Sequence, residues 1–208
     1  MARKTGKINA RDTFYIITNG ERSEKNYFDL LKSYKSIYDV KVEYENRDPL
    51  GLVEFAVRYR KDANQVWCVF DIDASHKEER LIPAIKLAEE HNIKYAFSNL
   101  AFEVWLISHF QVCDKCMNCS QHKALLDLII KNELKLNQEY DKADKELLEK
   151  YFVPNYLTAL ENTKKVHQKF MKEHKENFGD NSRPRIWEWN SCTTVYKLVE
   201  ALKLQKKL

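Results

Sequence analysis

Acidic side chains follow two of the most apolar segments of this chain. Glu21 comes shortly after the run 12–18 (DTFYIIT), and Asp71 and Asp73 stand at the end of the run 66–72 (VWCVFDI). Alternation along an extended chain points Asp71 and Asp73 to the same side, so that both can reach one cation. These three carboxylates are therefore the first candidates for a metal site.

The chemistry that suits such a cluster is metal-assisted. Several carboxylates that converge on one spot need a compensating positive charge, because a desolvated and unpaired charge is strongly unfavourable. Oxygen ligands favour Mg²⁺ or Mn²⁺ over zinc. Such an ion neutralises phosphate charge and activates a water, which is what phosphodiester cleavage requires. In the alternative interpretation Glu21 and Asp71 are helix caps or surface loop residues, since acidic residues are common at strand-to-helix turns.

A second cluster combines three cysteines with a histidine at a regular spacing. Two residues separate Cys113 from Cys116, Cys116 from Cys119, and Cys119 from His122. Three thiolates and an imidazole can complete a tetrahedral zinc site, with His109 as an alternative fourth ligand. The competing interpretation is a trio of reduced, exposed cysteines in a loop, because closed zinc sites usually combine two distant ligand pairs. If zinc binds, we expect a structural clip and not the catalytic metal.

The elements that must position these residues alternate between strand and helix in the first half of the chain. Short apolar or alternating runs predict strands, and stretches with helical spacing of apolar residues predict helices between them. The predicted strands are 12–18, 38–45, 66–72 and 93–97, and the predicted helices are 24–36, a segment opening at Pro49, and 77–91. This order predicts an α/β fold, Rossmann-like, with a mostly parallel sheet flanked by helices.

Strand signals disappear after about residue 101, and the remaining segments have helical patterns. We therefore expect three parts: a basic N-terminal tail (1–11), an α/β domain (12–112), and a helical C-terminal region (113–208) with the cysteine cluster at 113–122. In open parallel sheets, ligands bind beyond the carboxyl ends of the strands. That rule places Glu21, Asp71 and Asp73 where a ligand is expected.

Composition narrows the function only a little. Lys and Arg total 35 against 31 Asp and Glu, so the formal net charge of +4 permits a polyanionic partner without indicating one. No export signal and no apolar stretch of about 20 residues is recognisable, so we expect a cytoplasmic protein with no membrane partner, whose five cysteines are thiols or metal ligands. There is no Walker A loop, so any ATP or GTP hydrolysis would come from a partner.

Three motifs together resemble the RloB-like proteins, a Toprim-related family, over roughly residues 12–110. They are Gly20-Glu21-x-Ser23-Glu24-x-x-Tyr27-Phe28, Val69-Phe70-Asp71-x-Asp73, and Ser98-Asn99-x-x-Phe102-Glu103-x-Trp105-Leu106-x-x-His109-Phe110. Weaker matches follow at 140–142 (YDK) and 190–198 (NSCTTVYKL). The chain departs from the family pattern at Leu100, where proline is usual, and at Ser191-Cys192, which replace Pro-Ser.

The resemblance implies a Toprim-like fold, Mg²⁺-dependent cleavage of DNA or RNA, and a role in bacterial anti-phage defence. Carried onto this chain, it makes Glu21 a general base or metal ligand, and Asp71 and Asp73 the metal-binding pair. Lys142 would contact the scissile phosphate. The second candidates are Glu24, Glu103 and His109.

Glu103 and His109 lie on one predicted helix, six residues apart. That spacing turns their side chains roughly 120° apart around the helix axis, so they need not face the same site. Histidine in a helix is also often a hydrogen-bonded structural residue.

Two further functions compete with a nuclease. One is a catalytically inactive subunit of a defence complex, beside a partner ATPase, that binds a nucleotide or nucleic acid in the same acidic pocket. The other is an accessory subunit that only binds DNA. Cleavage that depends on Asp71 would separate the nuclease from both, since fold alone does not give function.

Overall fold

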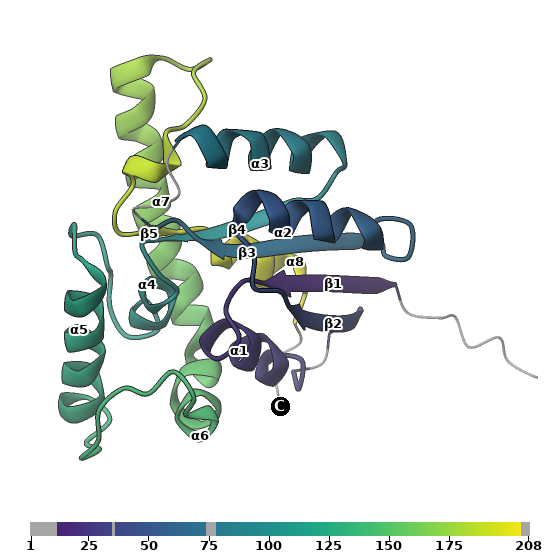
Figure 1. Ribbon diagram of the computed structural model, residues 1–208. Coiled ribbons are helices and arrows are strands. Elements are labelled where there is room, and N and C mark those ends of the chain that lie inside the picture. Colours follow the sequence, from purple (N-terminus) through teal and green to yellow (C-terminus); the bar gives the residue numbers. More distant parts are fainter. Residues whose placement is uncertain (1–11, 35, 74–77, 205–208) are drawn as a thin grey trace, which may run out of the picture.

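Five strands form one sheet at the centre of the molecule (Figure 1). The computed structural model describes residues 12–34, 36–73 and 78–204. The strand order is β2-β1-β3-β4-β5; the first four strands are parallel, and β5 is antiparallel to β4. The strands are β1 (Thr13–Thr18), β2 (Asp39–Tyr44), β3 (Gln65–Asp71), β4 (Lys94–Asn99) and β5 (Cys192–Thr193).

Eight α-helices are assigned in the described part of the chain. They are α1 (Ser23–Leu31), α2 (Pro49–Ala56), α3 (Glu78–Glu90), α4 (Glu103–Ile107), α5 (Cys119–Asn132), α6 (Lys145–Leu147), α7 (Tyr156–Phe178) and α8 (Val195–Ala201). Short 3₁₀ turns at 57–59, 153–155 and 186–188 and a π turn at 148–152 complete the elements.

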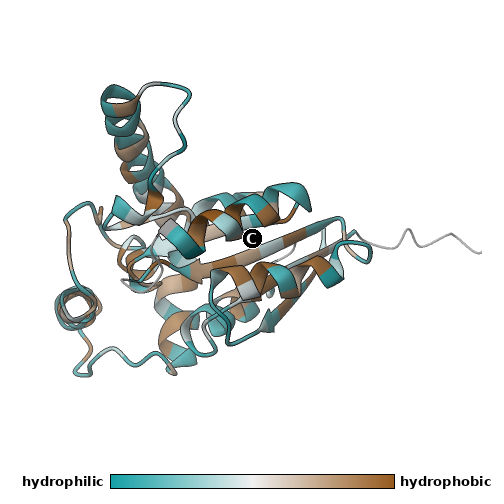
Figure 2. Cartoon of the chain, turned by 45° about the horizontal axis from the view of Figure 1, so that its top comes forward, coloured by the Kyte–Doolittle hydropathy of each residue, from teal (hydrophilic) through white to brown (hydrophobic). Residues whose placement is uncertain are grey.

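Two hydrophobic layers cover the two faces of the sheet. On one face α2 and α3 pack on Ile17 and Phe70, whereas α1, α4, α5 and α8 pack with Phe14 and Ile16 on the other. Residues alternate between faces along a strand, so a strand buried on both sides must be apolar throughout. Figure 2 shows brown segments in the strands at the centre and both brown and teal along the helices that cover them.

Helix α7 links the two layers at the β5 end of the sheet (Figure 1). Its first turns place Tyr156 and Ala159 in the layer with α1, and Val166 belongs to the layer with α2 and α3. One long helix therefore closes the sheet edge over both faces.

The strand register brings the loop after β1 beside the ends of β3 and β4. Asn19 donates its backbone N–H to the carbonyl of Val69 at 3.1 Å, and Ile72 donates to Ser98 at 2.8 Å. Because these three strands are parallel, their carboxyl ends open on one edge of the sheet. This is the edge where the sequence predicts a ligand.

The predicted α/β fold with a mostly parallel sheet and flanking helices is confirmed. The prediction that no strand follows residue 101 is wrong, because β5 pairs with Ser98 and Asn99. A strand of two residues is too short to give a periodic signal in the sequence. Its pairing extends β4 through Asn99, beyond the predicted strand end at residue 97. The peptide bonds Asn99–Leu100 and Asn190–Ser191 are cis.

Residues on both sides of position 112 share the same hydrophobic layers. Leu126, Phe152 and Leu198 are fully buried in the layer that contains Phe14 of β1. The C-terminal segments therefore complete the core of the sheet. The N-terminal tail predicted at 1–11 lies outside the described residues. No helix in the described ranges has the length and apolar character needed to cross a bilayer.

Candidate functional site

Three carboxylates and one lysine meet where β1, β3 and β4 end. Glu24 lies in the first turn of α1, Asp71 is the last residue of β3, and Glu103 opens α4 directly after β4. Glu24 is only 6% exposed and Glu103 only 4%, whereas Asp71 is half-buried. The Lys142 Nζ lies 2.8 Å from Glu103 Oε1. Four separate segments thus build one charged cluster, which we call the carboxylate cluster: Glu24, Asp71, Glu103 and Lys142.

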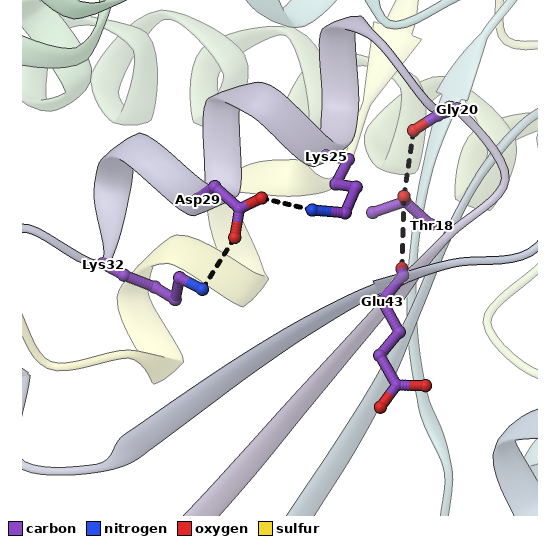
Figure 3. A network of polar contacts seen from close by, with 6 residues as sticks. All are labelled: Thr18, Gly20, Lys25, Asp29, Lys32 and Glu43. Atoms are coloured by element: carbon purple, nitrogen blue, oxygen red, sulfur yellow. Dashed lines mark hydrogen bonds and ion pairs between the residues drawn. The ribbon is translucent and has the colours of Figure 1, made fainter.

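Gly20 makes room for the Glu24 carboxylate. A Cβ atom placed on Gly20 would lie 1.8 Å from Glu24 Oε2 and 2.0 Å from Glu24 Cδ. The Thr18 hydroxyl holds this turn by donating to the Gly20 carbonyl at 3.0 Å, with the Glu43 carbonyl at 3.4 Å (Figure 3). Any larger residue at position 20 would therefore displace Glu24.

Tyr140 fixes the segment that carries Lys142. Its hydroxyl is 3.3 Å from the Ser23 Oγ at the start of α1, and its backbone N–H donates to Asp127 Oδ1 at 2.7 Å. Burial, followed by the charge of Glu103, raises the pKa of Tyr140, so its hydroxyl stays protonated. Tyr140 is thus a positioning residue that brings Lys142 over the cluster.

Burial and neighbouring carboxylates raise the pKa of Glu24 and of Asp71. Burial raises the pKa of Glu24 to about 7, and Glu103 adds to this, while the backbone N–H of Glu24 and the Lys142 ammonium oppose it. Burial and then the charges of Glu24 and Glu103 raise the pKa of Asp71 well above its usual range. Partial burial lowers the pKa of Lys142, but the surrounding carboxylates outweigh this and raise it. One lysine therefore leaves the cluster short of positive charge.

An open depression of about 330 Å³ gives access to the cluster. Its wall consists of Asn19, Gly20, Glu21, Arg22, Ser23, Glu24, Asp71 and Lys142. The buried Oδ1 atom of Asn19 has no hydrogen-bond partner among the described residues. A buried oxygen without a partner is costly and is available to a cation or donor in the depression.

The sequence candidates fall into two groups at this edge. Asp71 is in the cluster, together with the second candidates Glu24 and Glu103 and with Lys142. Glu21 is exposed and lines the depression, and Asp73 is exposed. The carboxylate cluster therefore consists of Asp71 and of three side chains that the family motifs indicated.

His109 lies away from the cluster, in the core. It is 2% exposed, its Nδ1 donates to the carbonyl of Trp105 at 2.9 Å, and its Nε2 accepts from the Tyr27 hydroxyl at 2.9 Å. Burial lowers the pKa of His109 to about 4, so the ring is neutral. His109, in the turn directly after α4, ties the end of that helix to α1, and Glu103 at the start of α4 lies in the cluster.

The cysteine cluster is spread between core and surface. Cys113 is buried, while Cys116 and Cys119 are exposed. The Nε2 of buried His122 is 2.8 Å from Ser191 Oγ. Burial, followed by Glu103 and Asp71, raises the pKa of Cys119, which opposes thiolate formation. Zinc binding by these residues stays a prediction.

The carboxylates of the cluster and the Asn19 amide oxygen beside it suit a hard cation, because carboxylate and amide oxygens are the ligands of Mg²⁺. Within the described ranges, no three His, Cys, Asp or Glu side chains are close enough together to hold a metal ion. Lys142 supplies the positive charge next to Glu103. The residues that would hold a divalent ion here are Asp71, Glu24 and Asn19, which line the same depression.

Three residues of this site were not singled out from the sequence. Asn19-Gly20 indicated only a turn, and the steric role of Gly20 depends on where α1 folds back. Tyr140 stood in a weak motif beside Lys142, and its contact with Ser23 joins positions 117 residues apart. Long-range contacts of this kind leave no periodic signal in a single sequence.

Fold and site define an α/β protein with a buried acidic cluster at the carboxyl ends of parallel strands. The sequence pattern of the family described as RloB-like protein matches residues 14–202. The chain therefore belongs to the RloB-like family. No curated protein and no solved structure shows a significant match to it.

Proposed function

We propose that this protein is a Toprim-like, metal-dependent nuclease that hydrolyses phosphodiester bonds in nucleic acid. The observation that carries the proposal is the buried, charge-deficient carboxylate cluster of Glu24, Asp71 and Glu103 beside an open depression. Such a cluster is unfavourable in isolation and gains most from a divalent cation. Membership of the RloB-like family is compatible with this activity.

In the proposed mechanism, Asp71, Glu24 and the Asn19 oxygen would hold Mg²⁺ or Mn²⁺. The ion, when bound, supplies charge neutralisation for the phosphate and a water of lowered pKa. Glu24 must lose its proton first, because its pKa is raised to about 7. Glu21, exposed at the rim, accepts the proton of the attacking water.

Lys142 has two successive partners in this proposal. It first neutralises Glu103, and its 59% exposed side chain is free enough to turn toward a phosphate that enters the depression. There its ammonium stabilises the charge that develops in the transition state. Tyr140 keeps the base of this segment in place during the movement.

A cleavage assay tests the proposal. Purified protein is incubated with single- and double-stranded DNA and with RNA, with Mg²⁺, Mn²⁺ or EDTA. We expect metal-dependent cleavage that Asp71→Asn lowers by about a hundredfold, the loss typical for removing one preorganised electrostatic group. Asp62→Asn, at an exposed position outside the depression, should cleave like the wild type. Equal cleavage by Asp71→Asn and wild type would refute the site.

A nonhydrolytic binding subunit is the second candidate. The ion pair between Lys142 and Glu103 favours it, because this lysine stands where a catalytic cation would need access. Binding of Mn²⁺ and oligonucleotide without cleavage under any of these conditions would select this function. A role in anti-phage defence, with or without an ATPase partner, extends either proposal and follows from the family resemblance alone.

A further inference from the structure

A large cavity lies away from the carboxylate cluster. It occupies about 830 Å³ around the first half of β4, between α3, α8 and the end of α7. Sites for small molecules in proteins typically measure about 300–1,000 Å³. Its wall combines apolar, aromatic and basic side chains, among them Ile85, Tyr95, His167, Arg183, Trp189 and Lys197.

This cavity is separate from the candidate active site. It contacts β4 at Lys94–Phe97, whereas Asp71 pairs with Ser98 near the opposite end of that strand. The two sites share no wall residue. A molecule bound in the larger cavity would therefore be an effector or second ligand and not the nucleic acid that is cleaved.

Lys197 brings a cation without a counter-ion to the wall of the cavity. It makes no ion pair with any residue in the described ranges, in contrast to Arg183, whose Nη2 lies 3.1 Å from Glu89 Oε2. Partial burial lowers the pKa of Lys197. Lys197 as a whole is exposed, and its charge lies close enough to the buried His167 ring to lower the pKa of that ring, so an anionic ligand there would be stabilised.

His167 adds a polar atom beside Lys197. The residue is 9% exposed, and its Nδ1 lies 3.0 Å from the Tyr196 hydroxyl. Within the part of the chain that is described, no group bonds to Nε2. Burial, followed by the charge of Lys197, lowers the pKa of His167 to about 4, so the ring is neutral. When Tyr196 donates to Nδ1, the ring proton is on Nε2, which becomes a donor for an anion.

The rest of the wall is apolar and aromatic. Tyr95 is half-buried, and its ring stacks on Phe70 with an interplanar angle of 18°, which fixes it; Trp189 is only 5% exposed and packs behind the wall against Phe170, in the same hydrophobic layer as Ile85. Flat, rigid aromatic walls bind planar rings by stacking. The cavity therefore combines donors for an anion with surfaces for a planar ring.

We propose that this cavity binds a nucleotide, with its phosphate at Lys197 and His167 and its base against the aromatic wall. A nucleotide combines both halves of this chemistry in one molecule of suitable size. The charge of Lys197 favours an anion, and the half-buried Tyr95 ring offers a surface for a planar ring.

Calorimetric titration of the full chain tests the proposal, with AMP, GMP, CMP and UMP as probes and with adenosine and inorganic phosphate as half-ligands. We expect at least one nucleotide to bind more tightly than either half-ligand. Lys197→Ala should weaken that binding about tenfold, as expected for losing one charge-assisted hydrogen bond. Lys86→Ala, an exposed lysine of α3 outside the cavity, is the matched control and should bind like the wild type.

A second readout is the NMR spectrum of the His167 ring. Its signals should shift when the nucleotide is added to the wild type and to Lys86→Ala, and much less in Lys197→Ala at the same concentration. The proposal is overturned if no probe binds the wild type, if Lys197→Ala binds with unchanged affinity, or if inorganic phosphate binds as tightly as the best nucleotide. None of these results bears on cleavage at Asp71, so this proposal and the nuclease can fail separately.

Discussion

At the scale of single residues, the site depends on a glycine as much as on its acids. The Glu24 carboxylate occupies the space where a side chain at position 20 would begin, with 1.8 Å between Glu24 Oε2 and the Cβ position. The three atoms nearest to that position all belong to the Glu24 carboxylate, so Glu24 must move. The requirement for glycine therefore comes from close approach and not from backbone conformation.

Gly20→Ala should consequently move Glu24 out of the carboxylate cluster. We expect Mn²⁺ affinity to fall about tenfold or more, while the circular dichroism spectrum stays that of a folded protein, because loss of one carboxylate ligand costs at least one charge-assisted interaction. Gly51→Ala is the control, since its Cβ would meet nothing closer than 3.1 Å. Equal Mn²⁺ affinity in Gly20→Ala and Gly51→Ala would contradict this role.

The raised pKa of Glu24 predicts how stability depends on pH when no metal is present. The carboxyl group has a pKa of about 7 in the folded protein and 4.5 as its ordinary value, so the folded state binds more protons between these pH values. Its contribution to stability is complete below pH 4.5 and is lost as pH rises through about 7. The loss is at most about 1.4 kcal/mol per pH unit over this window.

Urea unfolding in EDTA at several pH values measures this effect. The wild type should lose more unfolding free energy than Glu24→Gln between pH 5 and pH 7.5, since the amide cannot ionise (pH values are approximate). Glu54→Gln, at an exposed position on α2, should follow the wild type. Parallel pH curves for the wild type and Glu24→Gln would show that burial does not raise this pKa.

At the scale of elements, α1 and α4 must keep a fixed distance, because they carry Glu24 and Glu103. The buried hydrogen bond from the Tyr27 hydroxyl to His109 Nε2 is 2.9 Å long and joins the two helices. The neutral imidazole is locked by its donation to the Trp105 carbonyl. His109 thus affects the site indirectly, by fixing the position of α4 relative to α1.

Tyr27→Phe should destabilise the fold by about 1–3 kcal/mol, because it leaves His109 Nε2 buried without a partner. Tyr38→Phe is the control, since no hydrogen bond of its hydroxyl is found among the described residues. Thermal unfolding gives the comparison. At temperatures where both variants are folded, Mn²⁺ affinity should stay within about twofold of the wild type, a change of under half a kcal/mol. A large loss of affinity in folded Tyr27→Phe would point to a direct role for this pair.

At the scale of the whole molecule, the features that depend on local sequence patterns could be predicted, whereas those that depend on contacts between residues far apart in the sequence could not. The alternation of strands and helices is local, and it predicted the parallel sheet and the edge at which Asp71 lies. The family motifs predicted that Glu24, Glu103 and Lys142 belong near that edge.

Features that arise only from distant contacts were missed or misplaced. Strand β5 exists because Cys192 and Thr193 pair with Asn99 and Ser98, almost a hundred positions earlier. The inward turn of His109 depends on Tyr27, 82 positions away. Asp73 shares the strand direction of Asp71, yet it is exposed, because β3 ends at Asp71 and alternation stops there.

The carboxylate cluster is assembled from α1, β3, α4 and the segment at Lys142. The central claim is that its carboxylates bind a divalent cation. Titration with Mn²⁺ followed by electron paramagnetic resonance at about pH 8, where Glu24 is mostly ionised, tests it most directly. We predict that wild type and Asp62→Asn bind Mn²⁺ equally and that Asp71→Asn binds about tenfold or more weakly. Unchanged Mn²⁺ affinity in Asp71→Asn, or no binding to the wild type, would contradict the account.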